Sequence, residues 1–302
     1  MDMIKKLDCL LFKSKKPINL LKFILLIMVI NIAGCQTNNP NKIALNANMY
    51  KELHTTHDFI ITSYVRSKNQ IDPDKPLFIY IEGDGKAWIS KYRLSKNPTP
   101  DDPLTLKLAA IDPNPNIIYI ARPCQFTPLN LDHNCSSKYW SQARYSKQVV
   151  DSINEVIDNF KSSIFTENLS KQDIHLVGYS GGATIAGLIA SQRNDVKSLR
   201  TIAGNLDHDA VSNWHQTTKL EESLNLINFT KNISHIPQMH YIGENDQIIP
   251  VYIIKNFVTN VNEHNHRHCA HYKIFKNLDH YHGWVDGWKQ LVEQIPICSL
   301  EK

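Results

Sequence analysis

The sequence predicts an α/β protein with a mostly parallel central sheet that is flanked by helices. Short runs of β-branched and aromatic residues alternate along the chain with longer segments in which apolar residues recur at helical spacing. Several of the short runs are apolar on both faces, as a buried parallel strand requires. No internal repeat and no second change in composition follows residue 50, so we expect one domain over residues 50–302.

The expected strands combine high strand propensity with flanking turn residues. They cover residues 59–65, 77–81, 117–121, 174–177, 199–203, 238–242 and 272–275. One long amphipathic helix is marked by apolar residues at helical spacing, namely Tyr145, Val149, Ile153, Val156, Ile157, Phe160 and Ile164. Further helices are expected over residues 181–191, 251–261 and 284–294. Residues 207–232 fit no strand, and we expect them to form a small lid-like insertion over the edge of the sheet.

Residues 1–34 resemble the signal peptide of a bacterial lipoprotein. Six lysines against two aspartates are followed by the apolar run FILLIMVI and by Ala33-Gly34-Cys35, which is similar to a lipobox. The resemblance implies cleavage before Cys35 and lipidation of its thiol, and more than one acyl chain would hold the protein stably on a membrane. Gln36 after the cysteine resembles the outer-membrane sorting pattern, so we expect a periplasm-facing location. The alternative is an uncleaved anchor helix, which the short apolar run disfavours.

The segment after the lipidation site is expected to be a tether. Residues 35–49 are rich in asparagine, which is typical of a flexible linker. The residues before Cys35 account for the whole formal net charge of +4, so the remainder is neutral and carries no charge run that indicates nucleic acid as a partner. The expected partners are a small-molecule ester or acyl substrate and the membrane through its lipid anchor. The oligomeric state stays open, with a monomer favoured.

The cysteine count indicates two disulfides. Removing Cys9 with the signal peptide and assigning Cys35 to lipid leaves four cysteines, an even number in an exported protein. We favour pairing Cys124 with Cys135 because the loop between them is short and polar, which leaves Cys269 with Cys298. Buried free thiols are the alternative.

Gly178-Tyr179-Ser180-Gly181-Gly182 matches the G-x-S-x-G motif. The predicted strand IHLV leads into it and the small-residue segment GGATIAGLIA follows it, as in a nucleophile elbow, where a strained turn exposes the serine at the edge of the sheet. Glycine allows the strand and helix to approach closely there. A glycine-rich turn formed by chance is the alternative, and it would not explain the strand before and the helix after.

The chain resembles a family of bacterial lipoproteins with the α/β-hydrolase fold, which are esterase-like and lipase-like serine hydrolases. The resemblance rests on YIEGDG, ARPC, KYWSQARYS, GYSGG, IAGNLDHDAVSNWH, GENDQIIP and DHYHGW, in that order, and spans residues 77–292. It implies carboxylic ester hydrolysis through an acyl-enzyme, with Ser180 as nucleophile, Asp246 as acid and His280 as base. Glu244 is the alternative acid and His282 the alternative base. No cofactor is expected.

An oxyanion hole requires two backbone N–H donors near the serine. Gly181, which follows the nucleophile, is expected to supply one. Asp84 is expected to supply the other through its backbone, because Glu82-Gly83-Asp84-Gly85 follows the strand at residues 77–81 and stands where the family usually has His-Gly. Alternatively, Glu82 and Asp84 make a structural turn or bind a cation.

Two other functions compete with catalysis. The run from His264 to His271 is dense in potential ligands, and His264, His266 and His268 alternate as zinc or copper ligands on an extended segment would. We favour a solvated loop, because a disulfide at Cys269 would remove the best ligand, and we expect no metal. The other alternative is a binding protein that has kept the fold and lost catalysis.

Overall fold

The computed structural model describes residues 38–66, 71–90, 92–164 and 173–299. The chain divides into two units, Met1–Asn38 and Asn39–Lys302, and the account below concerns the second. The predicted signal peptide at residues 1–34 and the lipidation site Cys35 lie outside the described residues. Within the described ranges, no helix combines the length and apolar character needed to cross a bilayer.

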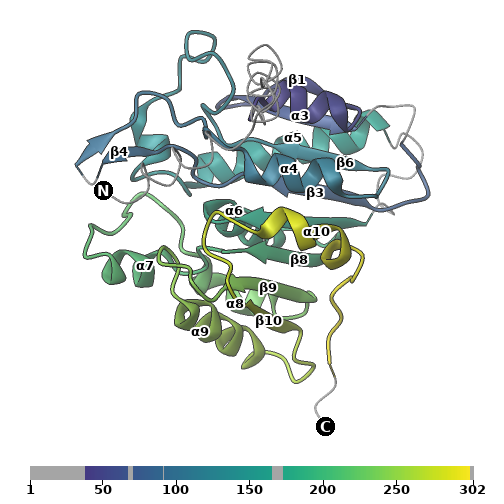
Figure 1. Ribbon diagram of the computed structural model, residues 1–302, viewed down its shortest axis with the longest axis vertical. Coiled ribbons are helices and arrows are strands. Elements are labelled where there is room, and N and C mark those ends of the chain that lie inside the picture. The colour runs from purple at the N-terminus through teal and green to yellow at the C-terminus, as the bar shows by residue number, and fades with distance from the viewer. Residues whose placement is uncertain (1–37, 67–70, 91, 165–172, 300–302) are drawn as a thin grey trace, which may run out of the picture. The chain divides into compact units, whose positions relative to one another are not determined.

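In the part of the chain that the structure describes, the central sheet has eight strands in the order β1-β2-β6-β3-β7-β8-β9-β10 (Figure 1). The first three are joined by antiparallel pairs, and every later pair is parallel. The strands are β1 (Met49–Thr55), β2 (Ile60–Arg66), β3 (Leu77–Ile81), β6 (Ile117–Ile120), β7 (Ile174–Tyr179), β8 (Val196–Ile202), β9 (Gln238–Gly243) and β10 (Ala270–Phe275). A separate hairpin contains β4 (Trp88–Ser90) and β5 (Arg93–Leu94).

Helices cover both faces of the sheet (Figure 1). One face packs against α5 (Lys147–Ile164), α6 (Gly181–Ala190) and α9 (Val251–Asn262), and the other against α3 (Pro40–Asn46), α4 (Leu104–Ile111) and α10 (Trp284–Val292). Strand β3 shows why both layers are needed: Ile79 lies in the first apolar cluster, Tyr80 in the second, and both are fully buried. The predicted α/β-hydrolase fold is confirmed.

All seven predicted strands and all four predicted helices are present, but several elements of the described residues were not predicted, among them β1, α4, α3 and both strands of the hairpin. Strand β1 is mostly exposed, so its sequence MYKELHT lacks the apolar run of a buried strand. Helix α4 (LTLKLAAI) has five of its eight residues buried, so it lacks the broad polar face that marks a surface helix.

The prediction of a flexible tether over residues 35–49 is wrong from residue 40 onward. Residues 40–46 form α3, and Met49 begins β1. Asn39 caps the helix, since its side chain accepts hydrogen bonds from the amides of Asn41 and Lys42 at 3.0 and 3.3 Å, and Pro40 occupies the first turn. The asparagine-proline pair that indicated a linker is therefore a helix start.

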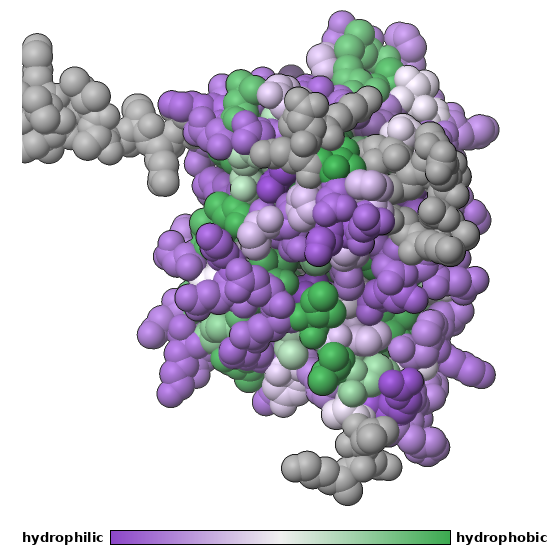
Figure 2. All heavy atoms as spheres, turned by 90° about the vertical axis from the view of Figure 1, so that its right-hand side faces the viewer, coloured by the Kyte–Doolittle hydropathy of each residue, from purple (hydrophilic) through white to green (hydrophobic). Residues whose placement is uncertain are grey.

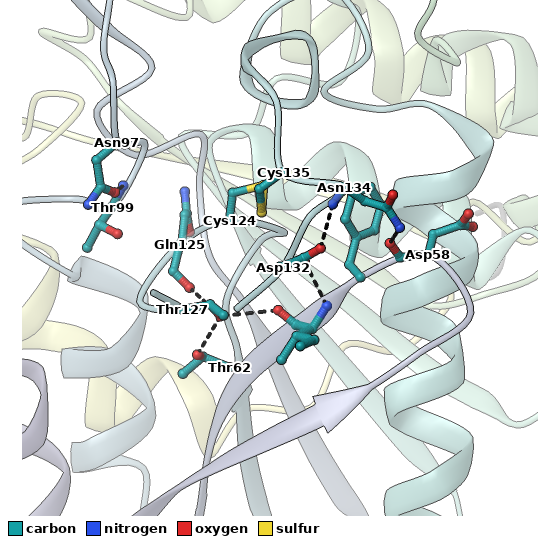
Figure 3. Close-up of a disulfide and its surroundings, with 12 residues drawn as sticks. Asp58, Thr62, Asn97, Thr99, Cys124, Gln125, Thr127, Asp132, Asn134 and Cys135 are labelled. Carbon is teal, nitrogen blue, oxygen red and sulfur yellow. Dashed lines mark hydrogen bonds between the residues drawn. A yellow bond between two sulfur atoms is a disulfide. The ribbon is translucent and has the colours of Figure 1, made fainter. Parts of the chain in front are cut away.

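Both predicted disulfides are present, Cys124–Cys135 and Cys269–Cys298. The first closes a loop beside the sheet, where Thr127 binds the hydroxyl of Thr62 on β2 at 2.9 Å (Figure 3). The disulfide therefore closes this loop on itself, and hydrogen bonds tie the loop to the sheet.

The expected insertion forms α7 (His208–Trp214), a 3-10 turn (Leu226–Phe229) and α8 (Thr230–Ile233). Helix α7 and the β4–β5 hairpin lie at the same end of the sheet (Figure 1). Figure 2 shows the face at the right-hand side of Figure 1, where hydrophilic side chains separate small groups of hydrophobic ones. Such a mixed surface is typical of a face in contact with water.

Candidate active site

Ser180 lies on the tight turn between β7 and α6. Its backbone has φ 49° and ψ −119°, a strained conformation for a residue with a Cβ. A Cβ at Gly178 would clash with the backbone of Ala183, so glycine is needed where the strand and the helix meet. The Ser180 amide donates to the carbonyl of Ile202 on β8 at 3.0 Å, which fixes the turn to the sheet.

His280 contacts the serine hydroxyl. It follows β10, is 4% exposed, and its Nε2 lies 3.0 Å from Ser180 Oγ. The alternative base, His282, has a side chain that is 81% exposed, and its Nδ1 binds the carboxylate of Asp279 at 2.9 Å. The structure therefore brings the first candidate to the serine and leaves the second in solvent.

Asp246 contacts the other nitrogen of the same ring. Its Oδ2 lies 2.9 Å from His280 Nδ1, and its side chain is fully buried. Its Oδ1 accepts hydrogen bonds from the amides of Ile248 and Ile249, both at 2.8 Å. A carboxylate at Nδ1 places the ring proton there and leaves Nε2 able to accept the serine proton. The alternative acid, Glu244, is exposed.

The two predicted oxyanion donors lie next to each other. Gly181 opens α6, so its amide has no partner within the helix. Asp84 follows β3 and packs against Gly181 so closely that a Cβ at Gly181 would clash with the Asp84 carboxylate. Within the described residues, neither amide donates a hydrogen bond to a protein acceptor.

The Asp84 side chain is held by cations. Arg122 Nη1 donates to Oδ1 at 3.1 Å, and Arg144 Nη1 and the Tyr145 hydroxyl donate to Oδ2 at 3.0 and 2.8 Å. Burial alone would raise the pKa of Asp84, but the two guanidinium groups and the hydroxyl outweigh it and hold the pKa below its ordinary value. Sequence reasoning missed these three partners, because only the position of Asp84 after a strand was informative.

Glu82 has a structural position. Its carboxylate accepts hydrogen bonds from Thr105 at 2.6 Å, the Gly83 amide at 2.9 Å and the Tyr119 hydroxyl at 3.0 Å. Burial raises the pKa of Glu82 although these donors oppose the shift. Glu82 therefore has the structural role that was the alternative to an oxyanion-hole segment.

Two cavities adjoin Ser180, with volumes of about 530 and 470 Å³. Ser180, Asp84, Arg144, Trp88 and Ile248 line both. The larger also has a wall made by the hairpin, α7 and the segment after α7, with both apolar and polar side chains. Cavities of this size and mixed lining are typical of small-molecule sites. Trp88, on a hairpin that sequence analysis did not predict, is a further lining residue that was missed.

Two buried polar side chains line the larger cavity near the serine. The Asn205 amide N–H donates to the Ser180 carbonyl at 3.0 Å, and its Nδ2 donates to the Tyr145 hydroxyl at 3.3 Å. In the part of the chain that is described, Asn205 Oδ1 and both ring nitrogens of His208 lack a hydrogen-bond partner. Burial lowers the pKa of His208, which favours the neutral ring.

The histidine-rich segment gives the metal-binding alternative no support. His264 and His266 are exposed, and Cys269 is bonded to Cys298. Among the residues that the structure describes, no group of three or more histidine, cysteine, aspartate or glutamate side chains could hold a metal ion.

Solved structures with the same fold include several hydrolases. The esterase Pf2001 of Pyrococcus furiosus aligns with a TM-score of 0.56 and 12% identity over 84% of this chain and 91% of its own. Est1E of Butyrivibrio proteoclasticus aligns with a TM-score of 0.55 and 12% identity over 80% and 96%. The acylaminoacyl peptidase of Pyrococcus horikoshii has a TM-score of 0.55 and 11% identity over 81% of this chain and 40% of its own.

No curated protein sequence matches this chain significantly. A family model does match: Serine hydrolase (FSH1) covers residues 118–272, just over half of the 302 residues. The matched region includes Ser180 and Asp246 and ends before His280. The chain therefore belongs to the FSH1 serine hydrolase family.

Proposed function

We propose that this serine hydrolase cleaves carboxylic esters with Ser180 as nucleophile, His280 as base and Asp246 as the acid that orients it. The single observation that carries the proposal is the unbroken chain of contacts from Ser180 Oγ through the imidazole to the buried carboxylate, at 3.0 and 2.9 Å. Ser180 itself lies on a strained turn and lines two cavities.

In the first step, Ser180 Oγ attacks the ester carbonyl carbon while its proton moves to His280 Nε2. The carbonyl oxygen becomes negatively charged and accepts hydrogen bonds from the amides of Gly181 and Asp84. The tetrahedral intermediate then collapses, the carbon–oxygen bond to the alcohol breaks, and the imidazolium donates its proton to the departing alkoxide. Ser180 is left as an acyl ester.

In the second step, His280 takes a proton from water as the water oxygen attacks the acyl carbon. Collapse of the second intermediate returns the proton to Ser180 and releases the carboxylic acid. Asp246 accepts the hydrogen bond from Nδ1 throughout and is the buried counter-charge of the imidazolium. The two backbone amides on its Oδ1 leave Oδ2 to the ring.

Esters are favoured over amides by the structural relatives whose own chains are covered almost completely. Pf2001 and Est1E are described as esterases, and the fold spans 91% and 96% of their chains. The acylaminoacyl peptidase is covered over only 40% of its chain, so most of that protein has no counterpart in this alignment. Two cavities that meet at Ser180 suit a substrate with an acyl part and an alcohol part.

Graded nitrophenyl esters test this function. We expect wild type to hydrolyse at least one acyl length, and Ser180→Ala to lose at least about 10⁴-fold in kcat. Ser191→Ala is the matched control, because Ser191 ends the same helix and its hydroxyl binds only the carbonyl of Leu188 at 2.7 Å. Turnover that survives Ser180→Ala would contradict the assignment and favour a non-catalytic binding protein with a contaminating activity.

We further propose that the enzyme is exported and anchored to the outer membrane through a lipid on Cys35. Ala33-Gly34-Cys35 supports the anchor, and two disulfides suit an oxidising compartment. Fractionation of cells tests it: wild type should sediment with membranes and dissolve in detergent, and Cys35→Ser should not carry lipid. If wild type and Cys35→Ser associate equally with membranes, the lipid anchor is refuted, and the apolar run FILLIMVI would instead act as an uncleaved anchor.

A further inference from the structure

We infer that Arg122, Arg144 and Tyr145 are positioning residues for ester cleavage, because they grip the Asp84 carboxylate and thereby aim the Asp84 amide at the oxyanion. The inference rests on the proposed function and deepens it. We call Asp84 with these three partners the Asp84 clamp.

The clamp binds both carboxylate oxygens. Its three contacts range from 2.8 to 3.1 Å, Arg122 has a side chain only 4% exposed, and Asp84 is 18% exposed. A buried ion pair is weak evidence for stability, because its desolvation cost offsets much of the attraction. The clamp is better explained by the position that it fixes, since Asp84 lies against Gly181 in the elbow.

Hydrogen bonds on either side of Asp84 fix the loop, and the Asp84 amide is not used in any of them. The amide of Glu82 donates to Ile120 at 3.1 Å, that of Gly83 to the Glu82 side chain at 2.9 Å, and that of Lys86 to Pro98 at 2.9 Å. The Gly83 carbonyl accepts from Gln125 Nε2 at 3.0 Å. The Asp84 amide has no protein acceptor in the described part of the chain. A rigid loop with an unused N–H beside the elbow is what oxyanion binding requires.

The second support is the loop closed by Cys124–Cys135. Gln125 lies within this loop and Arg122 lies two residues before Cys124, and both reach the segment after β3 (Figure 3 shows Gln125 beside the disulfide). Cys124 has φ 70°, a left-handed conformation that an ordinary residue adopts only when its surroundings impose it. The disulfide therefore stabilises the segment that contains Gln125 and follows Arg122, the two residues that bind Gly83 and Asp84.

The charges of the clamp also matter. A bare carboxylate near a developing oxyanion would oppose catalysis by repulsion. Two guanidinium groups on one carboxylate leave a net positive charge, which favours the oxyanion. Arg122 therefore affects both the position of the donor and the sign of the local field.

Arg122 gives the cleanest test because it lines neither cavity at Ser180, whereas Arg144 lines both. In Arg122→Gln, we expect kcat for a nitrophenyl ester to fall by about 10-fold or more while KM stays within about 2-fold. This loss is smaller than the ~10²–10³-fold loss of kcat expected when an oxyanion donor is removed altogether, because the Asp84 amide is displaced and not deleted. The affinity for a phenylboronic acid, which forms a tetrahedral adduct on serine, should fall by a similar factor. Arg122→Lys, which keeps the charge, should recover part of the loss.

Asp195→Asn is the matched control, because Asp195 binds Arg193 and Lys161 in a partly buried cluster away from both cavities. Its kcat should equal that of wild type. If Arg122→Gln does not fold, Tyr145→Phe removes one hydrogen bond to Asp84 without a charge, and kcat should fall by about 3-fold or more at constant KM.

Four results would overturn the inference. If Arg122→Gln folds and keeps the kcat and the boronic acid affinity of wild type, the role of the clamp is refuted but the proposed function is not. The same holds if Arg122→Gln does not fold and Tyr145→Phe keeps the kcat of wild type. An equal loss of kcat in Asp195→Asn would show a general effect of destabilisation. If Ser180→Ala keeps full turnover, the proposed function fails, and the clamp loses its role with it.

Discussion

The two sides of the proposed oxyanion hole are held by different forces. Gly181 is fixed by local backbone structure, because it is the first residue of α6 and follows a turn that donates to β8. Asp84 is fixed by side chains from distant segments, mainly through two ion pairs. The position of the Gly181 amide depends on backbone geometry, which tolerates changes in surrounding side chains. The position of the Asp84 amide depends on each side chain that binds the Asp84 carboxylate. Outside the elbow glycines, side-chain substitutions should therefore leave the Gly181 amide in place, whereas substitutions in the clamp should displace the Asp84 amide.

After Ser180→Ala, the largest expected effect comes from removing the base that serves the serine of the elbow. His280→Gln removes the group that accepts the serine proton, so kcat should fall by about 10³-fold or more. His282→Gln is a matched control two residues away, because His282 is largely exposed and binds only Asp279. Its kcat should stay within about 2-fold of wild type. Ester hydrolysis by the two variants measures this, and a larger loss in His282→Gln would reverse the assignment of the base.

A smaller effect sharpens the comparison at the clamp side. Replacing both Cys124 and Cys135 by serine should lower kcat by about 10-fold, because Arg122 and Gln125 lose the anchor that places them. Replacing both Cys269 and Cys298 should leave kcat unchanged, since that bridge contacts neither cavity. Each pair should cost on the order of 3 kcal/mol of unfolding free energy. Activity and denaturant unfolding of both variants test this, and equal effects on kcat would contradict the clamp.

The smallest effect concerns an ion pair without a role in the site. The Asp195 pKa is lowered to about 2, because hydrogen bonds from Arg193 and Lys161 outweigh the effect of burial. The folded-state pKa lies below the ordinary value of 3.8, so this carboxylate stabilises the fold above pH ~4, and the contribution is lost as the pH falls toward 2. Asp195→Asn should cost about 1 kcal/mol at neutral pH.

Denaturant unfolding at pH 7 and pH 2.5 measures that contribution. The difference between wild type and Asp195→Asn should shrink at the lower pH, and kcat at pH 7 should not change. A difference that grows toward low pH would mean that the sign of the shift is wrong.

Much of the fold and of the site could be predicted because the informative residues are contiguous or follow strands. The elbow occupies consecutive residues, and Asp246 and His280 each follow a strand whose carboxyl end meets the same edge of the sheet. The sheet itself was predictable because strands buried on both faces have distinctive apolar runs.

The remainder could not be predicted for physical reasons. Arg122, Arg144 and Tyr145 reach Asp84 only after folding, across separations of 38, 60 and 61 residues, so no local pattern links them. Helix α3 did have a local signal in Asn39 and Pro40, but an asparagine-rich composition indicated a linker instead. Strand β1 is exposed at the sheet edge, where polar residues are tolerated.

The most direct test of the central claim is the site at which a fluorophosphonate modifies the enzyme, found by mass spectrometry of its peptides. Activation of Ser180 by His280 predicts one covalent adduct on Ser180, formed rapidly in wild type and at least about 10²-fold more slowly in His280→Gln. An adduct on another residue, or none at all in folded wild-type protein, would contradict the account.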